Sequence, residues 1–91
     1  MYGYIYETTN LINGKKYIGQ HRSEFFDTRY IGSGIILLEA VKKYGRENFE
    51  VKLIRECANN DELNAAEVAL IKETNAVASE NYYNIAHGGE G

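Results

Sequence analysis

The sequence lacks several features that would assign a protein to a class at once. It contains a single cysteine, Cys57, so no internal disulfide can form, and a reducing, cytosolic compartment fits. One cysteine and two distant histidines do not make a structural zinc site. No apolar run approaches the roughly 20 residues that cross a bilayer. We expect no signal peptide, because the N-terminus has no basic segment followed by an apolar one.

The chain also lacks a surplus of positive charge. Its formal net charge is −3, whereas strong nucleic-acid binders usually carry a basic surplus. The charge is unevenly distributed, because residues 13–30 are locally basic and residues 56–73 are acidic. Folding can bring the two parts into one site with charges of both signs, which is what a metal-assisted phosphodiesterase needs.

What the sequence does contain is typical of one small globular domain. The hydrophobic fraction is 44% and the charged fraction 25%, which argues against disorder. The length of 91 residues suits one domain and is too short for two, so we expect 1–91 to be a single domain. Eight tyrosines accompany no tryptophan, and most of them are expected to fill half-exposed positions.

The N-terminal part predicts a β-hairpin. Residues 2–8 and 15–21 are rich in β-forming side chains, and the Asn13-Gly14 turn signal separates them. The period of two places Tyr4 and Tyr6 on one face of the first strand and Ile5 on the other.

The rest of the chain predicts a helix, a strand and a second helix. Apolar spacing indicates a helix that Gly45 ends, then a strand over residues 48–57. The clearest helix lies within residues 59–76, where Asn60 or Asp61 can cap it. Its expected buried stripe is Leu63, Ala66, Leu70 and Ile71. The order β-β-α-β-α predicts an α+β fold, a small three-stranded antiparallel sheet flanked by helices.

Two short motifs carry a family resemblance. Tyr4-Ile5-Tyr6, ten intervening residues and Tyr17-Ile18-Gly19 resemble the signature of the GIY-YIG nuclease superfamily. The likeness continues in order through a loop with arginines, a helix, a strand and a helix with Glu67, to a closing segment with Asn84. It covers essentially the whole chain and is similar to the catalytic domains of phage and intron-encoded homing endonucleases. Each motif alone is weak, whereas the order and spacing together are specific.

The chain departs from the family pattern at two places. Tyr4 stands where the family has glycine, and Gly3 lies one residue early, which close backbone packing can tolerate. The family's catalytic arginine follows the second motif by about eight residues, but position 27 here is aspartate. Arg29 is the nearest match if the loop is longer, and Arg22 is the other candidate.

The resemblance implies a DNA endonuclease that depends on Mg²⁺ or Mn²⁺. Glu67 would hold the ion, since one carboxylate can bind a Mg²⁺ that keeps most of its waters. Arg29 would grip the phosphate through its planar fork of donors. Tyr6 would activate the water and Tyr17 would position it, provided that a cation lowers the tyrosine pKa. His21 is a second candidate acceptor for the proton of the water.

Five further residues are expected to have accessory roles. Tyr30 and Asn84 would support the site, with Asn84 bonding either the backbone or the surroundings of the glutamate. Lys15, Lys16 and Arg22 would contact the DNA backbone. The structural alternatives are a solvated helix glutamate, surface arginines, a loop histidine and tyrosines that only pack the hairpin. His87, in the glycine-rich tail, is expected to be structural.

Three questions stay open from the sequence. The chain is either a catalytic domain whose specificity comes from a further DNA-binding region or a minimal nuclease acting alone. A monomer with one site cuts one strand per encounter, so a double-strand break needs rebinding or a dimer. The rival class is a nucleic-acid-binding module that kept the fold and lost the reaction. Convergence of Tyr6, Tyr17, Arg29 and Glu67 in one cleft would favour the enzyme, acting in the cytoplasm of a host cell.

Overall fold

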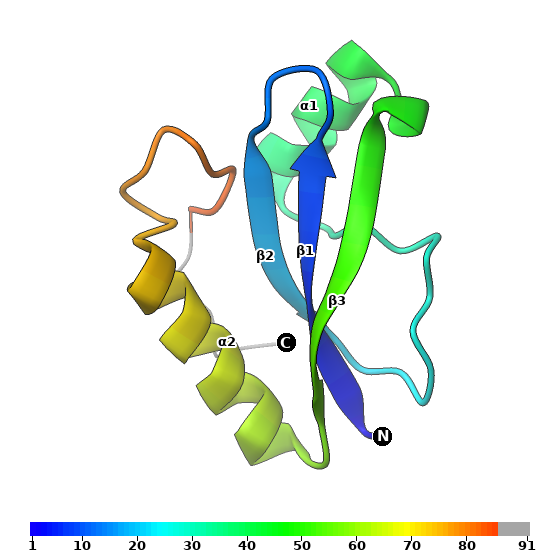
Figure 1. The fold of residues 1–91 in the computed structure, drawn as a ribbon, viewed down its shortest axis with the longest axis vertical. Coiled ribbons are helices and arrows are strands. Elements are labelled where there is room, and N and C mark those ends of the chain that lie inside the picture. Colours follow the sequence, from blue (N-terminus) through cyan, green and yellow to red (C-terminus); the bar gives the residue numbers. More distant parts are fainter. Residues whose placement is uncertain (86–91) are drawn as a thin grey trace.

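The computed structural model describes residues 1–85, and every structural statement below concerns that part of the chain. Two helices and a three-stranded sheet follow the predicted order, which is therefore confirmed (Figure 1). Within residues 1–85, no helix is long and apolar enough to cross a membrane. The elements are β1 (Gly3–Asn10), β2 (Lys16–His21), α1 (Ile35–Tyr44), the short 3-10 turn η1 (Arg46–Asn48), β3 (Phe49–Cys57) and α2 (Asn60–Thr74).

The sheet is antiparallel throughout, with the strand order β2-β1-β3. β1 lies in the centre because it forms the predicted hairpin with β2 and also pairs with β3. The hairpin turn forms at Asn13-Gly14, where Gly14 takes a φ of 77°. The Gly14 N–H donates to the Asn10 carbonyl at 2.8 Å, which closes the turn. The turn therefore fixes the register in which Tyr6 faces Gly19.

β3 contains an irregularity that the sequence pattern did not reveal. Tyr6 pairs with Leu53, whereas the preceding Ile5 pairs with Arg55, so Ile54 is an extra residue in β3. Such a bulge shifts the alternation of the strand by one residue. The Arg55 side chain therefore lies on the same face of the sheet as the Ile5 side chain. In a regular strand it would share the face of Leu53, which lies two residues earlier.

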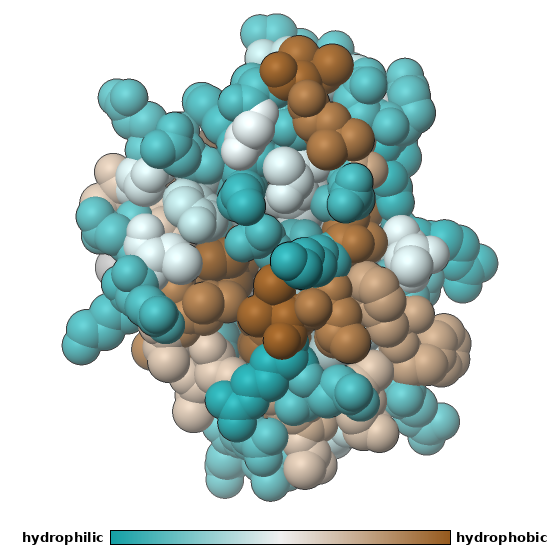
Figure 2. Space-filling view, viewed as in Figure 1, coloured by the Kyte–Doolittle hydropathy of each residue, from teal (hydrophilic) through white to brown (hydrophobic). Residues whose placement is uncertain are grey.

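Each face of the sheet packs against a different helix. Figure 1 shows α2 running beside β2 and α1 at the opposite end of the sheet. Figure 2 shows apolar side chains gathered in the middle of one face, between α2 and β3. The buried cluster on the α2 face comprises Ile5, Ile18, Cys57, Leu63, Ala66, Ile71 and Ala76. The cluster with α1 comprises Ile31, Leu37, Ala40, Phe49 and Tyr83.

The side chains of β1 alternate between the two faces of the sheet as predicted. Ile5 belongs to the cluster on α2, whereas Tyr4 and Tyr6 are buried on the opposite side with edge-to-face ring contact. The expected stripe of α2 holds for three of its four members, while Leu70 is only partly buried. Glu67 is buried on this helix instead, at 7% exposure.

The helix ends follow capping rules, with one correction. Gly34 enters α1 in an extended conformation, and Gly45 ends it with a φ of 93°. The N-cap of α2 is Asn59, not Asn60 or Asp61 as predicted, and its Oδ1 accepts from the Glu62 N–H at 2.8 Å. The predicted caps lie one and two residues too late. Asn59, Asn60 and Asp61 all have capping side chains, but the cap is the residue with extended backbone just before the helix, which is Asn59.

The outer edge of β2 is covered by the segment after α2. The Lys16 N–H donates to the Asn81 carbonyl at 2.9 Å, and the Tyr83 N–H donates to the Lys16 carbonyl at 2.8 Å. Asn84 continues this pairing with its side chain, since Oδ1 accepts from the Ile18 N–H at 3.0 Å and Nδ2 donates to the Ile18 carbonyl at 2.7 Å. The amide thus satisfies a buried peptide unit that an edge strand would otherwise leave unpaired.

Asn84→Ala tests this edge. The substitution leaves the buried N–H and C=O of Ile18 without partners, and each such group costs about 1–3 kcal/mol. We expect the free energy of unfolding to fall by about 2–5 kcal/mol in urea titration. Asn81→Ala is the control, because Asn81 acts through its backbone and its side chain is exposed. Equal stabilities of the two variants would contradict the role given to the Asn84 amide.

Candidate active site

Tyr6 lies across β2 at a position where that strand has no side chain. Tyr6 and Gly19 face each other in the β1–β2 ladder. A Cβ atom on Gly19 would collide with the Tyr6 hydroxyl. The glycine of the second motif therefore lets the Tyr6 ring pass over β2 toward the edge of the sheet. This contact joins the two halves of the signature physically.

Tyr17 is held between the sheet and the two glycines before α1. A Cβ on Gly32 would lie 2.9 Å from Tyr17 Cε2, and one on Gly34 would lie 2.7 Å from Tyr17 Cε1. The Gly32 position would also meet the Tyr6 hydroxyl at 3.0 Å. Gly32 thus packs onto both tyrosines and Gly34 onto Tyr17, and Gly34 is the N-cap of α1.

His21 and Tyr30 extend the aromatic cluster around Tyr6. The His21 and Tyr30 rings stack, with centroids 3.8 Å apart and an interplanar angle of 12°. Tyr30 meets Tyr6 edge to face, with centroids 5.6 Å apart. A residue of β2 and a residue of the following loop are therefore held beside the buried tyrosine.

Tyr4, which stands where the family has glycine, anchors the loop between β2 and α1. Its ring is buried against His21 and Phe26. Its hydroxyl accepts from the Asp27 N–H at 3.2 Å and contacts the Asp27 carbonyl at 3.5 Å. Gly3, one residue earlier, lets the backbone of β1 come close to that of β2, since a Cβ there would lie 2.7 Å from the His21 carbonyl oxygen. The departure from the family pattern is therefore accommodated by local packing.

Glu67 is a buried carboxylate at the β2 side of α2. Its Oε1 accepts from Gln20 Nε2 at 2.7 Å, so the alternative of a solvated helix glutamate does not hold. Burial, and less strongly the charge of Glu67, raises the pKa of both Tyr6 and Tyr17, so this carboxylate acts on the two tyrosines electrostatically.

The environment of Tyr6 and Tyr17 favours the protonated form of both hydroxyls. Burial strongly raises the pKa of Tyr6, and the nearby Tyr30 and Tyr17 hydroxyls raise it further. Burial also raises the pKa of Tyr17, with the Glu67 charge as the next contribution. Both hydroxyls are hydrogen-bond donors at neutral pH in this state. Either of them can serve as a base only where a cation lowers its pKa.

The two candidate arginines lie outside this group. The Arg29 side chain is 88% exposed, and its Nε lies 3.2 Å from Asp27 Oδ1. The Arg29 backbone N–H and then its guanidinium lower the pKa of the Asp27 carboxyl. Arg22 donates to Asn60 Oδ1 at 3.1 Å, at the first residue of α2. Arg29 therefore pairs with Asp27, and the convergence of Tyr6, Tyr17, Arg29 and Glu67 in one cleft stays a prediction.

The remaining predicted residues lie at the hairpin and its edge. Lys16 Nζ lies 3.1 Å from Glu7 Oε1, and Lys15 Nζ lies 6.0 Å from the Tyr83 ring centroid. Asn84 bonds the backbone of β2, which is one of the two alternatives stated for it. His87 lies outside the described residues.

Sequence reasoning missed Gln20, the residue directly after the second motif. Its amide contacts both Glu67 and Asn64. The signal was available, because the period of two that buries Ile18 against α2 also directs Gln20 toward that helix. In the sequence alone, a single glutamine with no recognisable interaction partner gave no reason to select it as a site residue.

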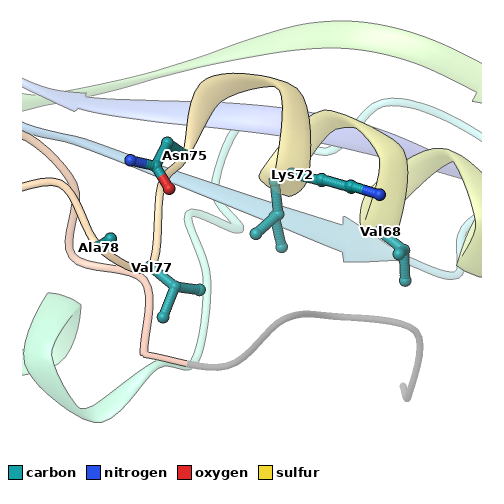
Figure 3. Close-up of a pocket in the computed structure, with 6 residues that line it drawn as sticks. Val68, Lys72, Asn75, Val77 and Ala78 are labelled. Carbon is teal, nitrogen blue, oxygen red and sulfur yellow. The ribbon is translucent and has the colours of Figure 1, made fainter.

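Two hollows lie away from the tyrosines. The larger one, about 330 Å³, opens at the C-terminal end of α2, where Val68, Lys72, Asn75, Val77 and Ala78 surround it (Figure 3). The smaller one, about 170 Å³, lies between α2 and β3. The walls of both lack Tyr6, Tyr17 and Glu67, so neither hollow belongs to the candidate site.

The donor set suits a lightly coordinated divalent ion. Among residues 1–85 there is no group of three or more histidine, cysteine, aspartate or glutamate side chains that could enclose a metal. Glu67 offers hard carboxylate oxygens, the ligands that Mg²⁺ prefers when it keeps its waters and takes further oxygens from a phosphate. The residues present therefore fit Mg²⁺ or Mn²⁺ and do not fit a closed zinc site.

Comparison with known proteins adds sequence and structural relatives. No protein-family model matches the chain. The segE protein of Enterobacteria phage T4 is 44% identical over 91 residues, covering 100% of this chain and 44% of that protein. Endonuclease segA of the same phage is 37% identical over 90 residues, covering 99% and 40%. A variant of the catalytic domain of the intron endonuclease I-TevI superposes with a TM-score of 0.78 at 28% identity, each chain covered completely.

The fold, the paired tyrosine motifs and these likenesses place the chain in the GIY-YIG nuclease superfamily. Within it, the chain has the fold of a homing-endonuclease catalytic domain and is similar in sequence to the phage T4 seg proteins. It spans less than half the length of the seg proteins described above.

The raised pKa of Tyr6 predicts a loss of stability at alkaline pH. Unfolded tyrosine loses its proton near pH 10, whereas buried Tyr6 keeps it, so the free energy of unfolding falls as the pH rises beyond about 10. Below that pH both states are protonated and the contribution is constant. Tyr6→Phe should make the decline shallower by up to about 1.4 kcal/mol per pH unit in urea titrations. Tyr2→Phe, at an exposed position, is the control, and equal slopes for both variants would contradict the burial of the Tyr6 hydroxyl.

Proposed function

We propose that this chain is the catalytic domain of a divalent-metal-dependent DNA endonuclease, which hydrolyses phosphodiester bonds. The observation that carries the proposal is the buried Glu67 carboxylate, which accepts a hydrogen bond from Gln20 of β2 and lies within electrostatic range of the protonated Tyr6 and Tyr17. A carboxylate in this setting would bind a hard cation, and the Tyr17 hydroxyl would donate a hydrogen bond to a phosphate oxygen. The names of the relatives, which include an endonuclease and an intron endonuclease, support the same activity.

Glu67 is the residue that would hold Mg²⁺ or Mn²⁺. When bound, such an ion polarises the phosphate and acidifies a coordinated water. Tyr17 is half-buried and Tyr6 fully buried, so Tyr17 is the hydroxyl that can reach a phosphate oxygen. The buried Tyr6 side chain would then have a structural role and maintain the shape of the site.

His21 is the second candidate to accept the proton of the attacking water. Its ring is half-buried and fixed by stacking on Tyr30, so its orientation is defined before substrate binds. The neutral imidazole ring has a nitrogen that can accept a proton, whereas Tyr6 keeps its own proton because burial raises the pKa of its hydroxyl. This gives His21 an advantage over Tyr6 as the base.

Arg29 would supply the cation on the developing phosphorane after leaving Asp27. The Arg29 side chain of the Arg29–Asp27 pair is highly exposed, and ion pairs with an exposed partner contribute little stability. A DNA phosphate can therefore compete with the Asp27 carboxylate for the guanidinium. Arg22 is the alternative, and it would need to leave Asn60.

The DNA partner is expected to contact the hairpin and the sheet edge through Lys15, Lys16 and Arg22. Sequence specificity would come from the part of the longer relatives that this chain does not span. One site cuts one strand at a time, so a double-strand break would need rebinding or a dimer. The substrate would be met in the cytoplasm of a host cell.

The position of Arg29 also favours a second candidate function. A nucleic-acid-binding module that lost the reaction would keep the fold and the tyrosine cluster without needing an arginine in the site. The 88% exposure of the Arg29 side chain is the observation that keeps this alternative open.

A supercoiled-plasmid nicking assay tests the proposal. We expect nicking that requires Mg²⁺ or Mn²⁺, is abolished by EDTA and falls at least 100-fold in Glu67→Gln, because the amide removes the charge that binds the cation. Glu73→Gln is the matched control, since Glu73 is an exposed glutamate on the same helix and should leave the rate unchanged.

Two arginine variants complete the same assay. Loss of nicking in Arg29→Ala with survival in Arg22→Ala would assign the phosphate contact to Arg29, and the reverse would assign it to Arg22. Absence of nicking by the wild type with either metal, together with a DNA gel shift, would reject the enzyme and support the binding module.

A further inference from the structure

Gln20 links the edge of the sheet to the helix that carries Glu67. It follows Tyr17-Ile18-Gly19 directly, and its side chain lies between β2 and α2. Its Nε2 donates to Glu67 Oε1 at 2.7 Å and to Asn64 Oδ1 at 2.9 Å. An amide nitrogen has two N–H groups, so these two contacts use its full donor capacity.

The orientation of this amide is fixed by the carboxylate. A rotated amide would place Gln20 Oε1 against Glu67 Oε1, and two acceptors at that separation repel each other. Asn64 and Glu67 lie three residues apart on α2, so they project from the same face of the helix. One amide therefore spans the two successive polar positions of that face.

The other end of the amide has no partner. Gln20 Oε1 is buried and accepts no hydrogen bond from any group in residues 1–85. A buried acceptor without a partner destabilises the folded protein. Methionine has nearly the same length; it would remove the unpaired Oε1 and also the two N–H donors, so its effects on stability oppose each other. Stability alone therefore does not explain the amide, and the contact with Glu67 does.

We propose that Gln20 is a positioning residue that orients the Glu67 carboxylate for the divalent cation. The proposal rests on the proposed function and deepens it. Gln20 acts through the carboxylate and touches neither DNA nor the reacting phosphate. Groups that orient a metal-binding carboxylate are worth about 10- to 100-fold in metal affinity or activity when removed.

Gln20→Met is the decisive variant. We expect the single-turnover nicking rate at saturating Mg²⁺ to fall by about 10- to 100-fold and the Mg²⁺ concentration for half-maximal rate to rise severalfold. Gln20→Glu keeps the shape but sets a second carboxylate against Glu67, and it should lose at least as much. Asn64→Ala should lose less, because the Gln20–Glu67 contact remains.

Two readouts separate positioning from a structural role. The affinity for DNA in EDTA and the midpoint of urea unfolding should match the wild type in Gln20→Met. A third readout does not depend on catalysis: Mn²⁺ broadens the NMR signals of backbone amides near Glu67. Gln20→Met should need severalfold more Mn²⁺ for the same broadening, and Glu73→Gln should behave as the wild type.

The outcomes are distinguishable. Wild-type rate and metal dependence in Gln20→Met would overturn the proposal. A loss of rate that parallels a lower unfolding midpoint would overturn it as well, because Gln20 would then be structural. If the wild type itself fails to nick DNA, the proposed function fails, and the Mn²⁺ broadening alone decides: equal broadening in Gln20→Met, or none near Glu67 in the wild type, rejects the role given to Gln20.

Discussion

The architecture of the site depends on one absent side chain, at Gly19. Without a Cβ at that position, the Tyr6 ring passes over β2, and any other residue would collide with its hydroxyl. Tyr17 and Gly32 then pack beside Tyr6, and Gly34 packs against Tyr17. This steric constraint gives the two separated motifs of the sequence a single physical purpose, which is to bring tyrosine hydroxyls to the edge of the sheet.

The edge of β2 is also where the oppositely charged parts of the chain meet. Gln20, within the locally basic segment, contacts Glu67 in the acidic one, and Arg22 contacts Asn60 at the start of α2. The segment after α2 secures the same strand through the Asn84 amide. Three parts of the sequence thus position one short strand, and a carboxylate with raised-pKa tyrosines lies along it. The proposed contacts with a cation and a phosphate would form along this strand.

The order of elements was predictable because it depends on local patterns. The Asn13-Gly14 turn, the alternation of β1 and the glycines around α1 each specify their own segment. The bulge at Ile54 was not predictable, since it appears only when β3 pairs with β1. The cap of α2 was misplaced among Asn59, Asn60 and Asp61, which share the same capping chemistry.

The site was predictable where the motifs define it and not where side chains cross between elements. Tyr6, Tyr17 and Glu67 were selected by resemblance, and the structure buries Tyr6 and Glu67 and half-buries Tyr17. The burial of Glu67 depends on how α2 docks against β2, which periodicity alone does not fix. Arg29 lies in an irregular loop whose path depends on the Tyr4–Asp27 contact. Gln20 matters only through a neighbour 47 residues away in the sequence.

The most direct test of this account is the nicking rate of Gly19→Ala compared with Gly14→Ala. The added methyl group displaces Tyr6, and a displacement of about 1 Å can reduce a rate by about 100-fold. Gly14→Ala strains a turn with positive φ but meets no atom within 4 Å, so it should lose stability and keep the wild-type rate. We predict a loss of at least 10-fold in Gly19→Ala, with the sheet retained by circular dichroism. Wild-type nicking by a folded Gly19→Ala would contradict the central role of this glycine.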